Sequence, residues 1–381
     1  VPFAKMVLQV EGQGQGIDAN GTTEQNDGSC SSSEDEAVDE RSVELLNRVD
    51  SLLEDEFGLG ALGKAAVQHR LRKMASDPTN MMHVRDWFLL TLNKGPSALE
   101  KRRLLFSPWQ QGCPDLIPGL QGKPFWQSES RMKELVALIE GSFESVAQEL
   151  REKQAQPVFQ PYRAPTWVNP QRVAQDGIGS LAHDSGNWDV CYLHLHNVDF
   201  SSNCELFPKT VAMIEAIPRW YCHAFISVLS PGTHITKHNG PTNKKLRVHL
   251  PLVVPPGGLC GIRVGDVEHL FELGKCLIFD DSFEHEAWNR HASMSRVCLI
   301  LDIWHPDLSD QEIQLLKFLE KGKMKRAKAI CQSTNPDAGT GSNRGDNFYA
   351  LLEHTRKLAA SSRAAEEEPP EAPPETATSS G

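Results

Sequence analysis

The chain has 381 residues, which is enough for one large domain with appendages or for two ordinary domains. Its formal net charge of −11 arises at the two ends: residues 1–40 hold nine acids against Lys5, and residues 360–381 hold five acids against Arg363. The rest of the chain is close to neutral, which argues against a nucleic-acid-binding surface. No run of about 18 apolar residues is present, so the sequence predicts no membrane-spanning helix within the chain.

The nine cysteines are scattered and include no CxxC pair. An odd, unpatterned set in a chain of this length indicates reduced thiols rather than a disulfide framework. The chain begins at Val1, so a signal or anchor upstream stays open. We expect a cytoplasmic protein, with a membrane-anchored or luminal protein as the alternatives.

Residues 11–40 are polar, acidic and rich in Gly and Ser, and they are too poor in apolar groups to offset the ordering entropy. We therefore predict a disordered acidic segment over residues 1–41. A helical pattern begins at Ser42 and continues through Lys64–Met74 and Met82–Leu92. We expect residues 42–105 to form a helical extension, which either docks a substrate or pads the core.

A further helical block is predicted from Glu129 to about Lys153. Between about 158 and 306, short β-branched or aromatic runs alternate with turn signals such as Pro231-Gly232. The runs that indicate strands are Ala224–Leu229, Leu246–Val254, Gly261–Val264, His269–Leu273, Lys275–Phe279 and Val297–Trp304. Many short strands at this spacing predict a sandwich or barrel-like double sheet, within a domain over 106–312.

Ser309 and Glu312 have the spacing of a capping box. This motif predicts the start of an amphipathic helix over Ile313–Leu319. Residues 313–381 are therefore expected to hold C-terminal helices, followed by a second disordered acidic tail.

Two histidines stand next to predicted strands. His238 lies in the run Pro231–Pro241, and His285 lies between a strand ending at Phe279 and another that starts near Val297. Imidazole suits Fe(II), and two imidazoles on neighbouring strand ends leave coordination positions open for a co-substrate and O2. Because the chain has 14 histidines, the alternative is an ordinary pair of surface or core histidines.

Basic side chains also occur inside apolar strands. Arg247 and His249 alternate on one predicted strand and therefore point to one face of the sheet, and Arg296 begins another strand. Buried cations need an anion to meet them. A dicarboxylate co-substrate would supply an anion to the basic groups of both strands, with Arg296 forming a bidentate pair to one carboxylate. The alternative is internal ion pairing to Asp280, Asp281 or Asp302.

Three long stretches of the chain carry a resemblance to a known family. They are HNGPTNKKLRVHLPLVVP (238–255), ELGKCLIFDDSFEHEAWN (272–289) and RVCLILDIWHPDLS (296–309). They resemble the core motifs of the aspartyl/asparaginyl β-hydroxylases, over about 222–310 and more weakly through Gly122–Trp126 and Gly186–Asp189. The resemblance implies a mainly β catalytic core, a double-stranded β-helix (jelly roll) with flanking α-helices. It also implies a dioxygenase that uses Fe(II), 2-oxoglutarate and O2.

The resemblance implies a role for each matching residue. His238 and His285 match two iron ligands. Gly240 stands where most related oxygenases carry an Asp or Glu ligand; the family is similar in lacking that carboxylate, which leaves its position to water or chloride. Arg296, helped by Ser227, matches the pair that holds the distal carboxylate of 2-oxoglutarate.

Three further residues match positions around the co-substrate. His249 matches a residue near the chelating end of 2-oxoglutarate, Arg247 matches one that faces co-substrate or substrate, and Trp126 matches an aromatic that lines the cleft. Two departures stand out: Arg296 lies one residue further along than in the family pattern, and only Cys204 of a cysteine pair found in secretory members is present. The missing cysteine weakens any inference of an oxidising compartment.

The implied reaction couples oxidative decarboxylation of 2-oxoglutarate to hydroxylation of an unactivated C–H bond. We expect a protein or peptide substrate, hydroxylated at the β-carbon of Asp or Asn, because Arg247 with Lys244 or Lys245 places positive charge beside the iron. The alternative for the two lysines is a solvated loop. The same chemistry on a lipid acyl chain or a small amino acid, and a catalytically silent jelly-roll binding module, also stay open.

Overall fold

The computed structural model describes residues 40–75, 81–93, 96–153, 159–196, 198–332 and 348–367. The disorder predicted for residues 1–39 and 368–381 lies outside the described residues. The helices of the described chain are α1 (Glu40–Asp55), α2 (Ala61–Ala75), α3 (Met82–Leu92), α4 (Pro96–Leu105), α5 (Lys133–Gly141), α6 (Phe143–Lys153), α7 (Ser201–Leu206), α8 (Pro208–Glu215), α9 (Asp310–Gln332) and α10 (Phe348–Glu367), with short 3-10 turns at Pro108–Gln110, Ser130–Met132 and Pro170–Arg172.

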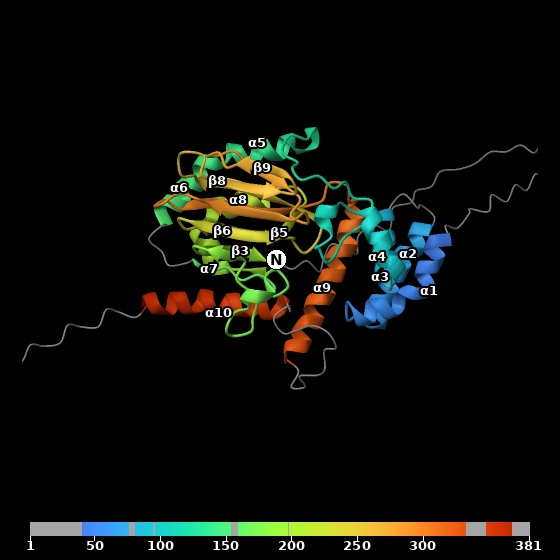
Figure 1. Ribbon diagram of the computed structural model, residues 1–381. Coiled ribbons are helices and arrows are strands. Elements are labelled where there is room, and N and C mark those ends of the chain that lie inside the picture. The colour runs from blue at the N-terminus through green and yellow to red at the C-terminus, as the bar shows by residue number, and fades with distance from the viewer. Residues whose placement is uncertain are drawn as a thin grey trace, which may run out of the picture. The chain divides into compact units, whose positions relative to one another are not determined.

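The strands form two antiparallel sheets (Figure 1). The larger sheet has the order β1-β3-β5-β12-β7-β10, with β4 paired to β3, and the smaller sheet has the order β2-β6-β11-β8-β9. Their bounds are β1 (Gln160–Pro161), β2 (His183–Ser185), β3 (Trp188–Leu195), β4 (Val198–Asp199), β5 (Trp220–Leu229), β6 (Thr233–His238), β7 (Lys245–Val253), β8 (Cys260–Val264), β9 (Val267–Leu270), β10 (Leu277–Phe279), β11 (His285–Asn289) and β12 (Arg296–Trp304).

The chain crosses repeatedly from one sheet to the other, since β5 and β7 lie in the larger sheet while β6 lies in the smaller, and β11 and β12 are divided in the same way. This connectivity is that of the double-stranded β-helix, as the sequence predicted. An inner apolar cluster fills the space between the sheets and includes Phe225, Ile262, Phe279 and Ile300. Side chains alternate between the two faces of each strand, so the inward positions of β5, β7 and β12 face this interior.

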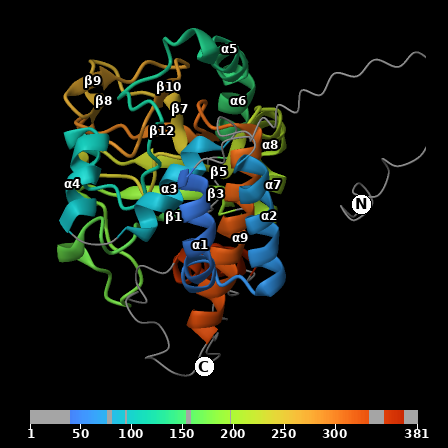
Figure 2. The same ribbon diagram turned by 90° about the vertical axis from the view of Figure 1, so that its right-hand side faces the viewer.

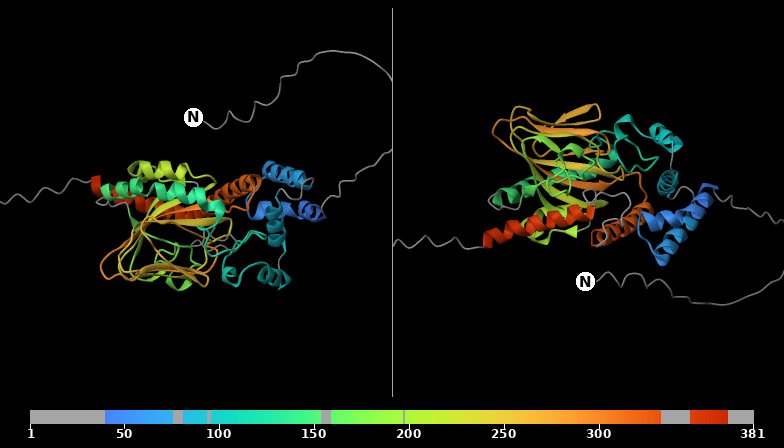
Figure 3. Two further views of the ribbon diagram at one scale, coloured as in Figure 1. Left: turned by 90° about the horizontal axis from the view of Figure 1, so that it is seen from above. Right: turned by 60° about the horizontal axis from the view of Figure 1, so that its bottom comes forward.

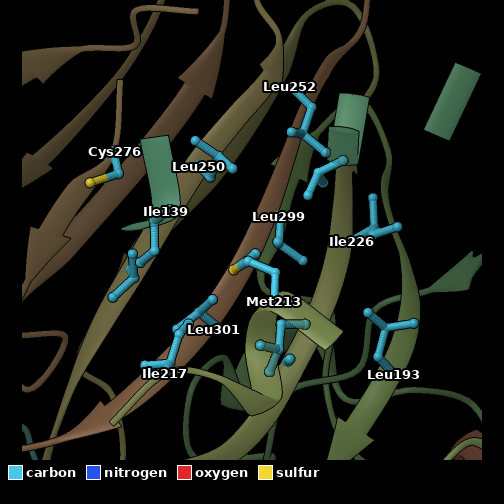
Figure 4. Packing of buried hydrophobic residues seen from close by; sticks show 14 of the residues in the cluster. Ile139, Leu193, Met213, Ile217, Ile226, Leu250, Leu252, Cys276, Leu299 and Leu301 are labelled. Atoms are coloured by element: carbon cyan, nitrogen blue, oxygen red, sulfur yellow. The ribbon is translucent and has the colours of Figure 1, made fainter. Parts of the chain in front are cut away.

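The outer face of the larger sheet is covered by helices (Figure 3). Figure 4 shows Ile226, Leu250 and Leu299 of three adjacent strands packing with Ile139 of α5 and Met213 of α8. The outward side chains of β7 and β12 are therefore nearly all aliphatic.

The N-terminal helices share one core cluster with the C-terminal helix α9. Leu45 of α1, Val67 of α2 and Phe88 of α3 belong to the same buried cluster as Leu316 of α9 and Trp304 at the end of β12. Figure 2 shows α1 and α2 beside α9. The helical segment 40–92 thus completes a core with α9 and β12, while the predicted domain boundaries stay predictions.

Most predicted elements are confirmed, and the errors have local causes. The helices expected from Ser42, Lys64 and Met82 are α1, α2 and α3. The helical block expected over 129–153 is confirmed and consists of the 3-10 turn at Ser130–Met132 and the helices α5 and α6, which are divided at Ser142. The expected C-terminal helices are α9 and α10, and α10 continues to Glu367.

Strands β3, β6 and β11 were not predicted, although two of them carry the candidate metal ligands. The sequences of β6 and β11 mix polar and apolar residues, which hides the strand pattern, whereas β3 is buried along nearly its whole length. The capping box at the start of α9 is confirmed: the Ser309 amide donates to Glu312 Oε2 (2.8 Å), and the Glu312 amide donates to Ser309 Oγ (3.2 Å). Among the described helices, none has the length and apolar character needed to span a membrane.

Candidate metal centre

Strands β6 and β11 of the smaller sheet bring the two candidate iron ligands together. His238 is the last residue of β6, His285 is the first residue of β11, and the two are direct cross-strand partners. Their ring centroids lie 4.2 Å apart. Residues separated by 47 positions in sequence therefore present two imidazoles side by side, at the end of the sheet.

Each ring is oriented by a backbone carbonyl. His238 Nδ1 donates to the carbonyl of Thr236 at 2.7 Å, and His285 Nδ1 donates to the carbonyl of Phe283 at 2.8 Å. This arrangement fixes the tautomer with the proton on Nδ1 and leaves Nε2 as an acceptor. Burial lowers the pKa of both imidazoles, that of His285 well below its usual value, so both rings are neutral as metal coordination requires.

Gly240 has no room for a carboxylate side chain. A Cβ atom at this position would lie 2.6 Å from Cγ and Oδ2 of Asp281 and 2.8 Å from the Asp281 carbonyl oxygen. The Gly240 amide donates to that same carbonyl at 2.6 Å. The packing of Asp281 against Gly240 therefore prevents a side chain at position 240 from serving as a third ligand.

Among the described residues, no group of three or more His, Cys, Asp or Glu side chains is placed to hold a metal ion. A centre at His238 and His285 has two protein ligands and leaves the remaining positions to small molecules. Asp281 Oδ1 is buried without a hydrogen-bond partner in the structure. This carboxylate, which the sequence suggested only as an ion-pair partner, borders the position where a third ligand would stand.

Arg296 is the buried cation that lacks an anion. Its side chain is 1% exposed, and Nε and Nη1 have no hydrogen-bond partner in the structure. Ser227, also fully buried, lies on the adjacent strand β5 directly opposite Cys298, two residues along β12 from Arg296 and on the same face. The internal ion pairing considered for Arg296 is absent among the described residues, which leaves its requirement for an anion unmet.

His249 lies between Arg296 and the histidine pair. Its ring packs against Phe271 (centroids 5.8 Å apart) and Phe279 (5.0 Å), while Phe271 contacts the Arg296 guanidinium and Phe279 contacts His285. Burial and then the nearby Arg296 charge lower the pKa of His249 well below its usual value. His249 Nδ1 is buried without a partner, so the interior between Arg296 and the histidine pair holds several unused polar atoms.

Arg247 differs from Arg296 because it has internal partners. Its guanidinium donates to both carboxylate oxygens of Asp302, at 2.9 and 3.1 Å, and lies 3.3 Å from Asp281. Burial opposes ionisation, but Arg247 and Lys245 still hold the pKa of Asp302 well below its usual value. The two alternatives considered from the sequence thus apply to different arginines. Arg247 forms internal ion pairs, whereas Arg296 has no ion-pair partner among the described residues.

The expectation that Lys244 and Lys245 offer free charge to a substrate is wrong, and so is the solvated-loop alternative. Lys245 is 2% exposed and lies 2.8 Å from Asp281 and 3.0 Å from Asp302. Lys244 is 5% exposed, pairs with Asp115 at 2.7 Å, and stacks over the Trp87 ring at 4.2 Å. The charges of both lysines are therefore neutralised by acidic residues that are distant in sequence and close in the folded chain.

Trp126 does not line the histidine pair. It is fully buried in the cluster on the outer face of the larger sheet, and its amide donates to Ile278. The sequence also missed the segment around Trp109 and Gln110, which ties the two metal-bearing loops together. Asn239 donates to the carbonyls of Trp109 and Ser282, both at 2.8 Å, and Gln110 donates to Ser282 Oγ at 2.8 Å. The sequence signal that could have pointed to this segment was the set of polar residues next to the histidine motifs.

Cys204 is not part of a disulfide, and neither is any other cysteine that the structure describes. Its Sγ lies 3.3 Å from the Leu193 carbonyl oxygen, and burial raises the pKa of the thiol to about 11. The prediction of reduced thiols is therefore consistent with the described residues.

Known proteins share the sequence around this site. Residues 140–306 match the family described as Aspartyl/Asparaginyl beta-hydroxylase. The chain is 34% identical over 220 residues to the human aspartyl/asparaginyl beta-hydroxylase, covering 56% of this chain and 26% of that protein. It is 40% identical over 120 residues to the ornithine lipid ester-linked acyl 2-hydroxylase of Rhizobium tropici, covering 31% of this chain and 42% of that protein.

The chain thus spans about a quarter of the human relative and less than half of the bacterial one. Among solved structures, an oxidoreductase of the 2OG-Fe(II) oxygenase family from Burkholderia pseudomallei aligns at 14% identity with a TM-score of 0.25, covering 42% of this chain and 90% of that one. The matched range includes the positions of His238, Gly240, His285 and Arg296. The segment from residue 140 to 306 is therefore similar in sequence to the aspartyl/asparaginyl β-hydroxylases.

Proposed function

We propose that this chain is an Fe(II)- and 2-oxoglutarate-dependent dioxygenase that hydroxylates the β-carbon of Asp or Asn residues in a polypeptide. The observation that carries the chemistry is the pairing of two features in one interior. One is the pair of adjacent imidazoles whose Nδ1 atoms are bound to backbone carbonyls, and the other is the buried Arg296, whose Nε and Nη1 lack a hydrogen-bond partner among the described residues. Fe(II) with bound 2-oxoglutarate supplies the oxidising chemistry when present.

Different residues of the chain would bind the iron and the co-substrate. His238 and His285 would hold the iron, and Arg296 with Ser227 would hold the distal carboxylate of 2-oxoglutarate as a charge-assisted pair. His249 lies between the two and would contact the chelating end of the co-substrate. The apolar walls formed by Phe271 and Phe279 exclude water from this interior, which strengthens each electrostatic contact.

The polypeptide substrate is supported by the likeness to the human aspartyl/asparaginyl beta-hydroxylase over 56% of this chain. A lipid acyl chain is the second candidate substrate. It is favoured by the 40% identity to the bacterial acyl hydroxylase, and by the internal pairing of Lys245 and Arg247, which leaves these cations less available to a substrate carboxylate.

The test of the chemistry is iron content and succinate formation from 2-oxoglutarate. Replacing either His238 or His285 by Ala should abolish stoichiometric Fe(II) binding and all turnover, because two ligands leave no redundancy. His234→Ala is the matched control: His234 is on the same strand β6, but its ring is bound to Asp184 and Glu286 on the opposite face. Full iron content in either ligand variant would overturn the assignment.

The test of the substrate is a panel of peptides that carry Asp, Asn or Ala at one position, offered beside acyl lipids and free aspartate. Mass spectrometry should show the gain of one oxygen on the Asp or Asn peptides and none on the Ala peptide. Oxygen gained only by the acyl lipid would replace the polypeptide proposal and leave the iron chemistry intact.

A further inference from the structure

A buried hydrogen bond joins Trp188 of β3 to Ser227 of β5. The Trp188 indole Nε1 donates to Ser227 Oγ at 3.0 Å, and the two residues are 6% and 0% exposed. They are diagonal neighbours, because the direct partner of Trp188 is Leu229, two positions after Ser227, and an aromatic side chain reaches across such a diagonal. Since Trp188 belongs to the inner apolar cluster, this bond lies inside the jelly roll and not on its outer face.

The same row of the larger sheet continues to Arg296. Leu229 is the direct partner of Trp188 on one side and of Arg296 on the other, so these three side chains share one face. Ser227, two residues before Leu229, is therefore a diagonal neighbour of both Trp188 and Arg296. The bond between indole and hydroxyl thus stands beside a guanidinium whose Nε and Nη1 lack a partner in the structure.

The chemistry of the two groups fixes the direction of this bond. An indole N–H can only donate, whereas a serine hydroxyl donates one proton and accepts at its oxygen. Ser227 is therefore the acceptor, and its own proton is left for a different group. Among the described residues, the indole is the one hydrogen-bond partner of Ser227 Oγ. The Ser227 hydroxyl and two nitrogens of Arg296 are consequently neighbouring donors without an acceptor, an arrangement that suits a carboxylate.

The indole is itself held in place by its other face. The rings of Tyr162 and Trp188 are stacked, with centroids 3.7 Å apart and planes inclined by 18°. The Tyr162 amide also donates to the Trp188 carbonyl at 2.9 Å. Rotation of the indole away from Ser227 would break the stack, so packing sets the direction of the N–H before any co-substrate binds.

We propose that Trp188 is a positioning residue for the co-substrate: its indole donates to the Ser227 oxygen and thereby directs the Ser227 proton toward the distal carboxylate of 2-oxoglutarate. This role rests on the proposed function, which places that carboxylate against Ser227 and Arg296. Without the indole N–H, the hydroxyl can rotate and donate elsewhere, and the carboxylate loses one of its donors. The alternative is that the bond only satisfies a buried indole, in which case its loss would act on stability alone.

The experiment is a double-mutant cycle of Trp188→Phe and Ser227→Ala in the full, iron-loaded chain. Affinity for 2-oxoglutarate is measured by calorimetry without O2, and KM and kcat of succinate formation are measured beside it. The second probe is 2-oxobutyrate, which lacks the distal carboxylate. The matched control is Trp126→Phe, because Trp126 is also fully buried and donates to the Lys123 carbonyl at 3.0 Å, but on the outer face of the sheet. Thermal unfolding checks the fold of each variant.

Trp188→Phe should weaken 2-oxoglutarate binding about threefold to tenfold, with kcat at saturating 2-oxoglutarate changed by less than about twofold, because one hydrogen bond to the co-substrate is affected. In the Ser227→Ala background the same change should have no further effect, and 2-oxobutyrate binding should not respond in either background. Equal weakening in both backgrounds, weakening of 2-oxobutyrate binding, an unchanged 2-oxoglutarate affinity, or the same loss in Trp126→Phe would each overturn the role of Trp188.

A second replacement covers the case in which Trp188→Phe does not fold. Benzothienylalanine at position 188 keeps the two-ring shape and lacks the N–H, and the same outcomes apply to it. Affinity for 2-oxoglutarate that ignores both Trp188→Phe and Ser227→Ala would refute only the positioning role. An unaltered chain that neither binds 2-oxoglutarate nor forms succinate would instead refute the proposed function itself.

Discussion

At the residue scale, the first prediction concerns Arg296, which lacks the internal partners that Arg247 has. Arg296 has no ion-pair partner among the described residues, so under the proposed function its replacement removes the charge that holds 2-oxoglutarate. Loss of a desolvated charge pair costs roughly 2–5 kcal/mol, and Arg296→Ala should raise the 2-oxoglutarate concentration needed for half-maximal succinate formation by tenfold or much more. Arg296→Lys should recover little, because Lys lacks the planar fork. Arg290→Ala, at an exposed position, is the control, and an unchanged requirement in Arg296→Ala would remove this assignment.

Gly240 makes a prediction about the missing third ligand. Since a Cβ at this position meets the Asp281 side chain and carbonyl at 2.6–2.8 Å, Gly240→Ala should lower the free energy of unfolding by about 1–3 kcal/mol through overpacking. Gly240→Asp should not create a three-ligand centre with normal iron affinity. Gly141→Ala, where nothing lies within 4 Å of the added atom, gives the baseline for denaturant titration, and a Gly240→Ala protein as stable as Gly141→Ala would contradict the steric argument.

At the scale of elements, one carboxylate joins two helices. Glu312 Oε1 accepts from the backbone amides of His83 and Val84 at the start of α3, and Glu312 Oε2 accepts from the Ser309 amide at the start of α9 and contacts His83 Nδ1 at 3.2 Å. Because at least three buried amides lose their acceptor, Glu312→Ala should destabilise the fold by about 2 kcal/mol or more. Glu44→Ala, on the exposed face of α1, should leave stability within about 0.5 kcal/mol.

The same pair predicts a pH window for stability. The hydrogen bond to Glu312 raises the pKa of His83, so the contribution of the imidazolium is present below its unfolded pKa and is lost as pH rises through the folded pKa. Burial raises the pKa of Glu312, but the bond to His83, the amides of Ser309 and Val84 and the His83 charge together outweigh burial. The net shift is downward, so the carboxylate contribution is lost as pH falls through that lowered pKa. The stability difference between the unaltered chain and His83→Gln should therefore be largest at mildly acidic pH, and a difference independent of pH would contradict the coupling.

The sequence predicted some strands and missed others for a physical reason. Strands β7 and β12 are buried on both faces, so the runs around Leu250 and Leu299 are apolar and easily recognised. Strands β6 and β11 carry a candidate ligand histidine inward and charged side chains outward, which removes the apolar pattern from these strands. The two candidate ligands were predicted from long motifs instead. The pairing of Arg247 with Asp302 depends on sheet register, and no motif encodes it.

At the scale of the whole molecule, the N-terminal helices complete the core beside α9. Removal of residues 1–105 would expose Trp304 and the α9 side chains Ile313, Leu316 and Leu319. Each such side chain contributes about 1.5–3 kcal/mol when buried, so the truncated chain should lose several kcal/mol of stability or its cooperative unfolding. Removal of residues 1–39 alone should change stability by no more than about a kcal/mol. Equal melting curves for the two truncations would mean that the N-terminal helices contribute little to the stability of the fold.

The shared core of α1–α3 and α9 also sets the order in which the protein can be completed during synthesis. His83 and Glu312 are 229 positions apart, and at roughly 5–20 residues per second the ribosome needs roughly 10–45 s to pass from one to the other. Throughout that interval the apolar faces of the first helices have no partner to cover them. These apolar faces are therefore open to chaperone binding until α9 emerges.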